Sequence, residues 1–322
     1  MRPELLWEGG DDARLDELEG VERRDLCAGM HAELVRVLDP SGTQAPPAFA
    51  PGPWVYFPWR PLLVRVLHKD AYRTVRASRN RDVILPAESE RLAKGCVGIV
   101  GLSVGHAMAR TLALEGVGRL RLIDGDELEL SNLNRVPQGL PQLGLSKAEA
   151  CARAIWELDP FIDIEVWPGR LEPEDIGRFV DGLDVVVDAC DSFGVKSGLR
   201  AGAKAAGLPL VMETSFRGTL DLENYARDPE HLPFHGALEG LAPPIDEDAR
   251  VAFFDALIGP LTPRVESALR GLGRTHVSYP QTGSDIMLGA ASVARLVRSL
   301  LLGDDVPSGR WRVDLEGMLG VE

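Results

Sequence analysis

The sequence predicts an α/β protein built on a doubly wound, mostly parallel sheet that follows an N-terminal α+β extension. First, apolar runs of strand length alternate with helical patterns between residues 96 and 212, an alternation typical of βαβ units. Second, an acidic residue directly follows several of these runs, as at Asp124, Asp188 and Glu213. Ligands bind open parallel sheets at the carboxyl ends of the strands. We therefore expect a site where these acids gather.

The composition is that of a soluble globular protein with a sizeable core. The chain has 322 residues, of which 45% are hydrophobic and 26% are charged. A net charge of −14 argues against nucleic acid or an anionic membrane as the main partner, because both carry negative charge. No apolar run approaches the roughly 20 residues that span a bilayer, and the first residues do not resemble a signal peptide. We therefore expect a cytoplasmic protein.

Cysteine and histidine spacing gives no sign of a structural metal site. The four cysteines are Cys27, Cys96, Cys151 and Cys190. None is spaced as C-x-x-C, so no zinc is expected. His231 and His235 lie four residues apart among prolines rather than on a predicted helix, which disfavours a metal site there.

The N-terminal extension is expected to span residues 1–78, and residues 79–322 are expected to form the α/β domain. Apolar spacing, prolines and aromatic density predict its elements. In order, these are a pair of packing helices up to residue 38, a proline-rich linker at 39–53, an aromatic strand at 54–60, a second strand at 62–67 and a short helix at 70–76.

A nucleotide-binding unit opens the α/β domain. A buried strand at 97–100 runs into a turn that contains Gly101, Ser103 and Gly105. A helix and a second strand follow, and that strand ends at Asp124. Such a turn lets phosphates approach the backbone, and the helix N-terminus favours their charge. The acid is placed to accept hydrogen bonds from ribose hydroxyls.

The residues after Asp126 distinguish two kinds of nucleotide. A βαβ unit with a glycine turn is most often found in NAD(P)-dependent oxidoreductases. This class of enzyme therefore stays an alternative function. Asn132, Arg135 and Lys147 follow here, however. The bridging pyrophosphate of NAD(P) does not need two further cations such as Arg135 and Lys147. A triphosphate that loses pyrophosphate needs them, because charge builds on the departing phosphates.

The remaining elements continue the alternation. Ser192 is a plausible N-cap of the helix that follows the fourth strand. The stretch 216–283 is irregular, with prolines and acidic residues, and is expected to be a lid or a partner-binding insertion. The expected elements are helices at 148–158, 172–180, 193–206 and 285–302, and strands at 162–166, 183–187, 208–212 and 311–315.

Taken in order, these motifs resemble the superfamily of ThiF, MoeB and the ubiquitin-activating enzymes. The resemblance rests on the glycine turn, a D-x-D at Asp124, an S-N-L-x-R at Ser131, a following lysine and a D-x-x-D that ends at Asp191. It covers residues 79–213 well. It implies an ATP-dependent adenylyltransferase with a Rossmann-like sheet and with ATP and Mg²⁺ as cofactors. The turn, the aromatic N-terminal stretch and the segment after Met212 resemble a bacterial branch of stand-alone ThiF-like proteins.

The resemblance implies a role for each motif residue. Asp124 would bind the ATP ribose with Asp126 in support. Asn132, Arg135 and Lys147 would hold the triphosphate, and Asp191 would bind Mg²⁺. Arg81 would enter the neighbouring subunit's site, which implies a homodimer. A substrate carboxylate, on a peptide or carrier-protein C-terminus or a small acid, would attack the α-phosphate and release pyrophosphate.

Three departures narrow this expectation. Ser103 stands in a glycine turn that is one residue short, and Val136 replaces the usual glutamine. No cysteine follows Cys190, so a thioester cysteine in the usual place is not expected, and Cys190 itself is expected to pack as a small residue. A non-catalytic partner subunit stays a second alternative. Arg217, just past Glu213, is either a substrate-carboxylate contact or part of a surface ion pair.

Overall fold

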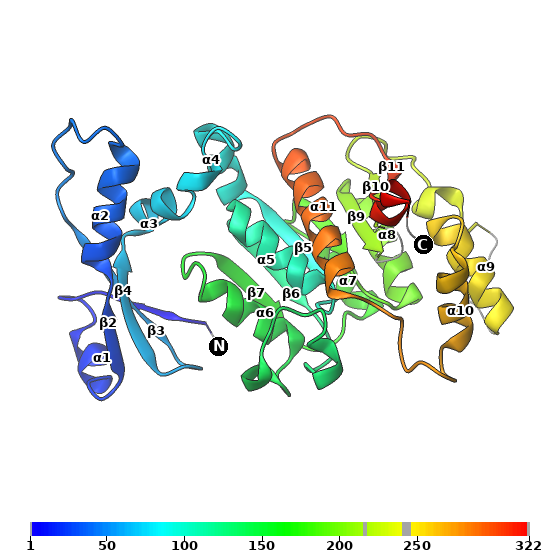
Figure 1. The fold of residues 1–322 in the computed structure, drawn as a ribbon, viewed down its shortest axis with the longest axis horizontal. Coiled ribbons are helices and arrows are strands. Elements are labelled where there is room, and N and C mark those ends of the chain that lie inside the picture. Colours follow the sequence, from blue (N-terminus) through cyan, green and yellow to red (C-terminus); the bar gives the residue numbers. More distant parts are fainter. Residues whose placement is uncertain (1, 215–217, 240–245, 321–322) are drawn as a thin grey trace.

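The computed structural model describes residues 2–214, 218–239 and 246–320. Its centre is a seven-stranded sheet with the order β11-β10-β9-β8-β5-β6-β7 (Figure 1). The five strands from β7 to β9 are parallel, and β10 and β11 continue the sheet antiparallel. This confirms the expected doubly wound, mostly parallel sheet. The strands are β5 (Cys96–Val100), β6 (Arg119–Ile123), β7 (Asp163–Trp167), β8 (Val185–Asp188), β9 (Pro209–Thr214), β10 (Thr219–Asn224) and β11 (Gly309–Arg312).

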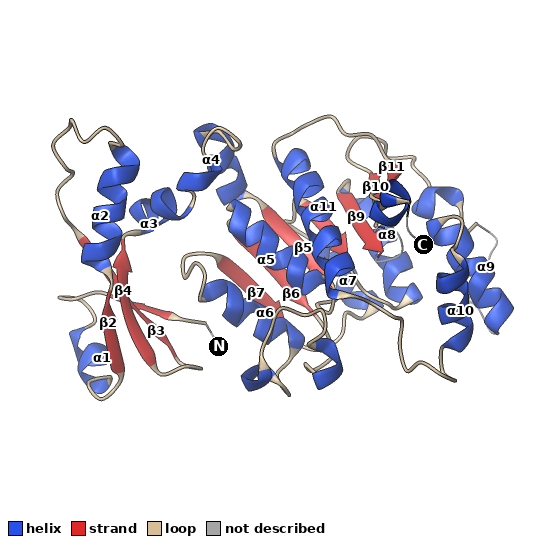
Figure 2. Ribbon diagram, in the orientation of Figure 1, coloured by secondary structure: helices blue, strands red, loops and turns tan. Residues whose placement is uncertain are grey.

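Helices cover both faces of this sheet because the strands are apolar on both sides (Figure 2). One core cluster joins the sheet to α5 (Gly105–Glu115), α6 (Lys147–Trp156) and α11 (Gly283–Leu301). A second cluster on the opposite face joins it to α7 (Ile176–Val180) and α8 (Phe193–Ala206). The predicted cap is present, since the Ser192 side chain accepts a hydrogen bond from the Val195 N–H.

The N-terminal residues form a four-stranded sheet of their own with the order β1-β3-β4-β2. Its elements are β1 (Glu4–Leu6), α1 (Asp12–Glu17), β2 (Glu22–Asp25), α2 (Cys27–Leu38), β3 (Pro51–Phe57), β4 (Leu62–Leu67) and α3 (Lys69–Arg76). The second strand and the short helix are confirmed. The aromatic strand expected at 54–60 is present as β3, but it begins and ends three residues earlier, so that its first residues fall within the expected linker at 39–53. The expectation of helices alone up to residue 38 is wrong, because β1 and β2 pair at the sheet edges. Strands of three and four residues are too short for alternation to show, and pairing decides their structure.

Contacts of α3 and of the loop after β3 fasten this small sheet to the α/β domain. The Trp59 ring lies 6.0 Å from that of Trp156, and the Tyr72 hydroxyl donates to the Leu158 carbonyl at 2.7 Å. Arg73 and Arg76 both face the fully buried Asp159, at 3.7 and 3.2 Å. Two of the arginines before the nucleotide unit therefore neutralise a buried carboxylate.

The stretch 216–283, expected to be irregular, contains β10 and two helices in its described part. They are α9 (Glu247–Ile258) and α10 (Pro263–Gly271). The side chains of Asp246 and Thr262 cap them by accepting from backbone N–H groups. The prolines misled the prediction because Pro263 occupies the first turn of a helix, where its missing N–H costs nothing.

Two further helices complete the description. Helix α4 (Pro86–Lys94) precedes β5, and helix α12 (Leu315–Leu319) is the last element of the described chain. The closing strand begins and ends earlier than the predicted range of 311–315. In the described part of the chain, no helix is long and apolar enough to cross a membrane.

Candidate active site

The turn between β5 and α5 is held open by glycine and braced by an acid. Gly101 has a φ of +89°, and a Cβ there would lie 2.4 Å from the Ala189 carbonyl oxygen. The Asp124 carboxylate accepts hydrogen bonds from the Leu102 N–H at 2.6 Å and the Asp126 N–H at 2.8 Å. Each oxygen keeps a further lone pair for a ligand. Asp124 therefore fixes the turn and still faces the space beside it.

A cleft of about 450 Å³ opens at the carboxyl ends of β5, β6 and β8. This nucleotide cleft, as we call it, lies where ligands bind in such sheets. Six of the residues predicted for the site line it: Gly101, Ser103, Asp124, Asp126, Lys147 and Asp191. Gly105 lies just behind, at the start of α5, where a Cβ would come within 2.8 Å of the Ile99 side chain.

Two cations meet Asp126 at one side of the nucleotide cleft. Lys147, the first residue of α6, is 7% exposed, and its Nζ lies 3.2 Å from Asp126 Oδ2. Arg170, which the sequence reasoning missed, lies 2.8 Å from Asp126 Oδ1. Arg170 follows β7, and it reaches Asp126 because β7 lies beside β6 in the sheet, a pairing that the local sequence pattern does not show. Asp126 carries one negative charge and its two partners carry two positive charges, so a phosphate could find a cation at this wall.

Arg135 supports the glycine turn, whereas Asn132 holds its own loop, and neither residue lines the nucleotide cleft. The Arg135 guanidinium donates to Ser103 Oγ at 2.9 Å. Burial lowers the pKa of Arg135, and the nearby Asp191 opposes this effect. Asn132 is buried, and its Oδ1 accepts from the Glu129 N–H at 3.0 Å. The triphosphate contacts assigned to these two residues stay predictions.

Arg81 lies in an exposed turn just after the 3₁₀ helix Ser78–Asn80. It is not among the residues that line the nucleotide cleft. Five residues earlier, Arg76 donates to the Ala113 carbonyl at the end of α5 that lies away from the glycine turn. Arg81 is therefore not brought to the site of its own subunit.

The two acids of the D-x-x-D motif, Asp188 and Asp191, have different surroundings. Asp188 is fully buried and contacts Arg200 at 2.7 Å and Lys196 at 3.0 Å. Burial raises its pKa, but Lys196 and Arg200 outweigh burial and hold the pKa at about 2. Asp191 instead faces the cleft. Desolvation of its carboxylate raises the pKa of Asp191. The positive charges of Lys196 and Lys147 lower this pKa, but their effect is smaller.

Cys190 lies between these acids as a thiol. Its Sγ donates to Asp188 Oδ1 at 3.2 Å. Burial and the Asp188 charge raise the pKa of Cys190, so the thiolate, the reactive form, is disfavoured at neutral pH. The geometry therefore agrees with the packing role expected from the sequence.

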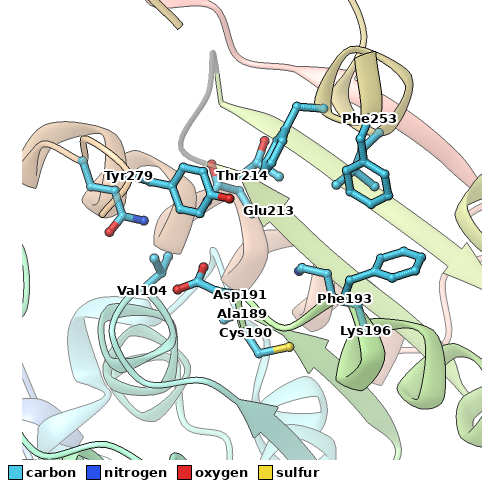
Figure 3. A pocket seen from close by; sticks show the side chains of 13 residues that line it. Val104, Ala189, Cys190, Asp191, Phe193, Lys196, Glu213, Thr214, Phe253 and Tyr279 are labelled. Carbon is cyan, nitrogen blue, oxygen red and sulfur yellow. The ribbon is translucent and has the colours of Figure 1, made fainter. Parts of the chain in front are cut away.

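A second, narrower cavity of about 90 Å³ adjoins the nucleotide cleft. We call it the aromatic cavity (Figure 3). The two spaces share Ala189, Cys190 and Asp191. Its other lining residues are Val104, Phe193, Lys196, Glu213, Thr214, Phe253, Phe254, Leu257, Tyr279 and Gln281. Sequence reasoning missed Phe253 and Phe254 because α9, which carries them, was not predicted.

Glu213, at the end of β9, is an unpaired acid in the wall of the aromatic cavity. Its side chain is buried, with the residue 5% exposed, and neither carboxylate oxygen has a hydrogen-bond partner among the described residues. Helix α11 packs so closely that a Cβ on Gly289 would lie 2.3 Å from Glu213 Oε2. Burial, with the Asp285 charge, raises the pKa of Glu213 to about 8. Arg217 lies outside the described residues.

Replacing Glu213 by glutamine should change how stability depends on pH. The folded chain binds this proton more tightly than the unfolded chain, whose carboxyl has a pKa near 4.5. The contribution of Glu213 to the free energy of unfolding therefore falls by about 1.4 kcal/mol per pH unit as pH rises from 4.5 to about 8. Glutamine does not titrate, so the advantage of Glu213→Gln should grow over this range and then level off. Urea unfolding at pH 5, 7 and 9 measures it; parallel curves for the two proteins would contradict the buried neutral acid.

The two histidines form a hydrogen-bonded chain. His231 Nε2 lies 3.0 Å from His235 Nδ1, and His235 Nε2 lies 3.1 Å from Asp221 Oδ2. Within the described ranges, no group of three or more His, Cys, Asp or Glu residues is arranged to hold a metal.

Comparison with known proteins agrees with this geometry. Residues 77–235 match the ThiF family. An uncharacterised protein of Mycobacterium tuberculosis is 43% identical over 277 residues, which cover 83% of this chain and 38% of that protein. The sulfur carrier protein adenylyltransferase of Thermus thermophilus is 27% identical over 269 residues, which cover 75% of this chain and 96% of that enzyme.

The fold is shared with solved structures. The E. coli tRNA N6-threonylcarbamoyladenosine dehydratase TcdA, crystallised with ATP, superimposes with a TM-score of 0.53 at 19% identity, over 72% of this chain and 96% of TcdA. The chain spans 38% of the length of the mycobacterial relative and 30% to 55% of the length of three further relatives. Residues 77–235 of this chain are a domain of the ThiF family.

Proposed function

We propose that this protein is an ATP-dependent adenylyltransferase that activates a carboxylate as an acyl-adenylate. The supporting observation is that the braced glycine turn, the Asp126-bound cations and Asp191 line one cleft, which joins the aromatic cavity at Asp191. In this proposal ATP occupies the nucleotide cleft, and the substrate carboxylate lies at the junction of the two spaces. The Thermus relative is named an adenylyltransferase. ATP as co-substrate favours a cytoplasmic location.

The chemistry needs charge and position rather than a protein nucleophile. A substrate carboxylate oxygen attacks the α-phosphorus, and the bond from that phosphorus to the bridging oxygen breaks, which releases pyrophosphate. Lys147 would neutralise charge on the leaving phosphates. Asp124 would hold the ribose, and the backbone N–H groups of the turn would hold phosphate.

Asp191 would hold Mg²⁺ together with oxygens of the triphosphate. Its carboxylate faces both spaces, whereas Asp188 is taken up by Arg200 and Lys196. One carboxylate plus phosphate oxygens is a ligand set that Mg²⁺ uses in proteins. Bound Mg²⁺ would supply charge neutralisation to the triphosphate.

The products of ATP test this proposal against its alternatives. A panel of carboxylic acids and peptides is incubated with the protein, Mg-ATP and hydroxylamine, which traps activated acyl groups as hydroxamates. We expect AMP, pyrophosphate and hydroxamate in equal amounts with at least one acid. Formation of ADP and phosphate would contradict adenylyl transfer. Protection from heat by NAD⁺ or NADP⁺ but not by Mg-ATP would favour an oxidoreductase, and protection by none of them a non-catalytic partner.

We also propose a homodimer in which Arg81 completes the partner's site, with residues 1–78 as a separate extension. The exposed position of Arg81, away from its own nucleotide cleft, supports this arrangement. Arg81→Ala and Lys147→Ala proteins should each have strongly reduced activity alone. Mixing them should restore activity, because one site in each mixed dimer then carries both residues. Failure of the mixture, with subunit exchange shown by native mass spectrometry, would contradict donation between subunits.

A further inference from the structure

The aromatic cavity begins where an acyl group must lie if the proposed function is right. It shares Asp191 and the Ala189–Cys190 backbone with the nucleotide cleft. In an acyl-adenylate the carbonyl carbon is joined to the α-phosphate through one oxygen. An α-phosphate beside Asp191 therefore directs the rest of the acyl chain into this cavity (Figure 3).

One part of the cavity wall is apolar and closely packed. Phe193 packs edge-on against Phe253 with ring centroids 5.0 Å apart, and Leu257, one turn further along α9, is 3% exposed. A cavity lined in this way gains affinity by removing an apolar group from water. A glycine terminus, which has no side chain, would leave it unfilled.

Two polar groups of the cavity wall have no hydrogen-bond partner among the described residues. Lys196 is engaged with Asp188 at 3.0 Å, so its charge is already balanced. Glu213, by contrast, is buried with no hydrogen-bond partner among the described residues, and the Thr214 hydroxyl beside it is also unpartnered there. Asp191 lines the mouth, and Asp285 and Tyr279 approach from α11 and the segment before it. Buried polar groups normally find a partner, and a ligand can supply one here.

We infer that the aromatic cavity is the acyl subsite and that it takes an apolar acyl group with one hydrogen-bonding group, which meets Glu213. The substrate is then a carboxylic acid, or a peptide terminus, with a bulky apolar group next to its carboxyl, rather than a carrier protein that ends in glycine. This inference rests on the proposed function.

Stable acyl-adenylate mimics test the subsite directly. Acyl-sulfamoyl adenosines share the nucleotide part and differ only in the acyl group. Binding by isothermal titration should be at least about tenfold tighter for phenylacetyl than for acetyl. The α-hydroxyl of the mandelyl compound should tighten binding further. If sulfamoyl adenosine, without an acyl group, fails to bind, the proposed nucleotide site is wrong. If it binds while phenylacetyl and acetyl bind equally, the subsite alone is wrong.

Variants locate the effect. Leu257→Trp fills the cavity and should abolish the preference for phenylacetyl while leaving sulfamoyl adenosine binding unchanged. Leu38→Trp, on an exposed leucine of α2, should keep the preference. Glu213→Leu should remove the advantage of the mandelyl hydroxyl, and Glu213→Gln should retain it. The inference would be overturned if the Leu257→Trp protein still preferred phenylacetyl, or if the Glu213→Leu protein still bound the mandelyl compound more tightly than the phenylacetyl compound. If a variant does not fold, the comparison of the phenylacetyl and acetyl compounds on the wild-type protein decides.

Discussion

Replacing Lys147 by alanine should slow AMP formation by about 100- to 1000-fold, the usual cost of removing one group that stabilises transition-state charge. Lys147 is buried at the start of α6, with its Nζ 3.2 Å from Asp126. Its charge is therefore fixed beside the cleft before ATP binds. The rate is measured with the acid that gives the most hydroxamate.

Two controls separate catalysis from folding in this experiment. Lys69→Ala removes an exposed lysine of α3 and should leave the rate unchanged. Asp126 keeps its contact with Arg170 in the Lys147→Ala protein, so the wall of the cleft and the unfolding transition should persist. A fall in rate of less than threefold would remove Lys147 from the catalytic set.

Replacing Arg200 by methionine should lower the free energy of unfolding by about 3–5 kcal/mol, the cost of stripping a buried charge of its partner. Arg200 is fully buried between Asp188 and Glu223, and its guanidinium carbon lies 3.8 Å from the centre of the Phe234 ring. The variant would leave Glu223 without its counterion and Asp188 with Lys196 alone. Urea unfolding at pH 7 measures the loss.

The double variant Arg200→Met, Glu223→Gln tests the reason for that loss. It removes the charge that Arg200→Met leaves without a counterion and keeps the Asp188–Lys196 pair, so it should recover most of the stability. Arg178→Ala, which breaks an exposed pair with Asp175, should cost less than about 1 kcal/mol. A double variant no more stable than Arg200→Met would show that packing, not charge, accounts for the effect.

The sequence was sufficient for the parallel sheet and for most of the nucleotide cleft. Strong apolar runs set β5, β6 and β8, and the acids that follow them necessarily come to one edge of the sheet. Asp124 and Asp191 could therefore be placed without coordinates. Roles such as metal binding by Asp191 depend on ligands, so they stay proposals.

The missed features depend on contacts between distant segments. Arg170 joins the site only because β7 lies beside β6. The aromatic cavity needs α9, which follows a proline-containing, acidic stretch, and the burial of Glu213 depends on the close approach of α11 at Gly289. Asn132 carries a motif position, but its side chain oxygen bonds the Glu129 N–H instead of lining the cleft. Local patterning contains none of this information.

The most direct test of the central claim is a crystal structure of the protein with Mg²⁺ and α,β-methylene ATP. We expect the ribose at Asp124, the phosphates along the Gly101–Ser103 turn and beside Lys147, and the α-phosphorus at Asp191, facing the aromatic cavity. A nucleotide bound elsewhere, or with its α-phosphorus turned away from that cavity, would contradict carboxylate activation at this site.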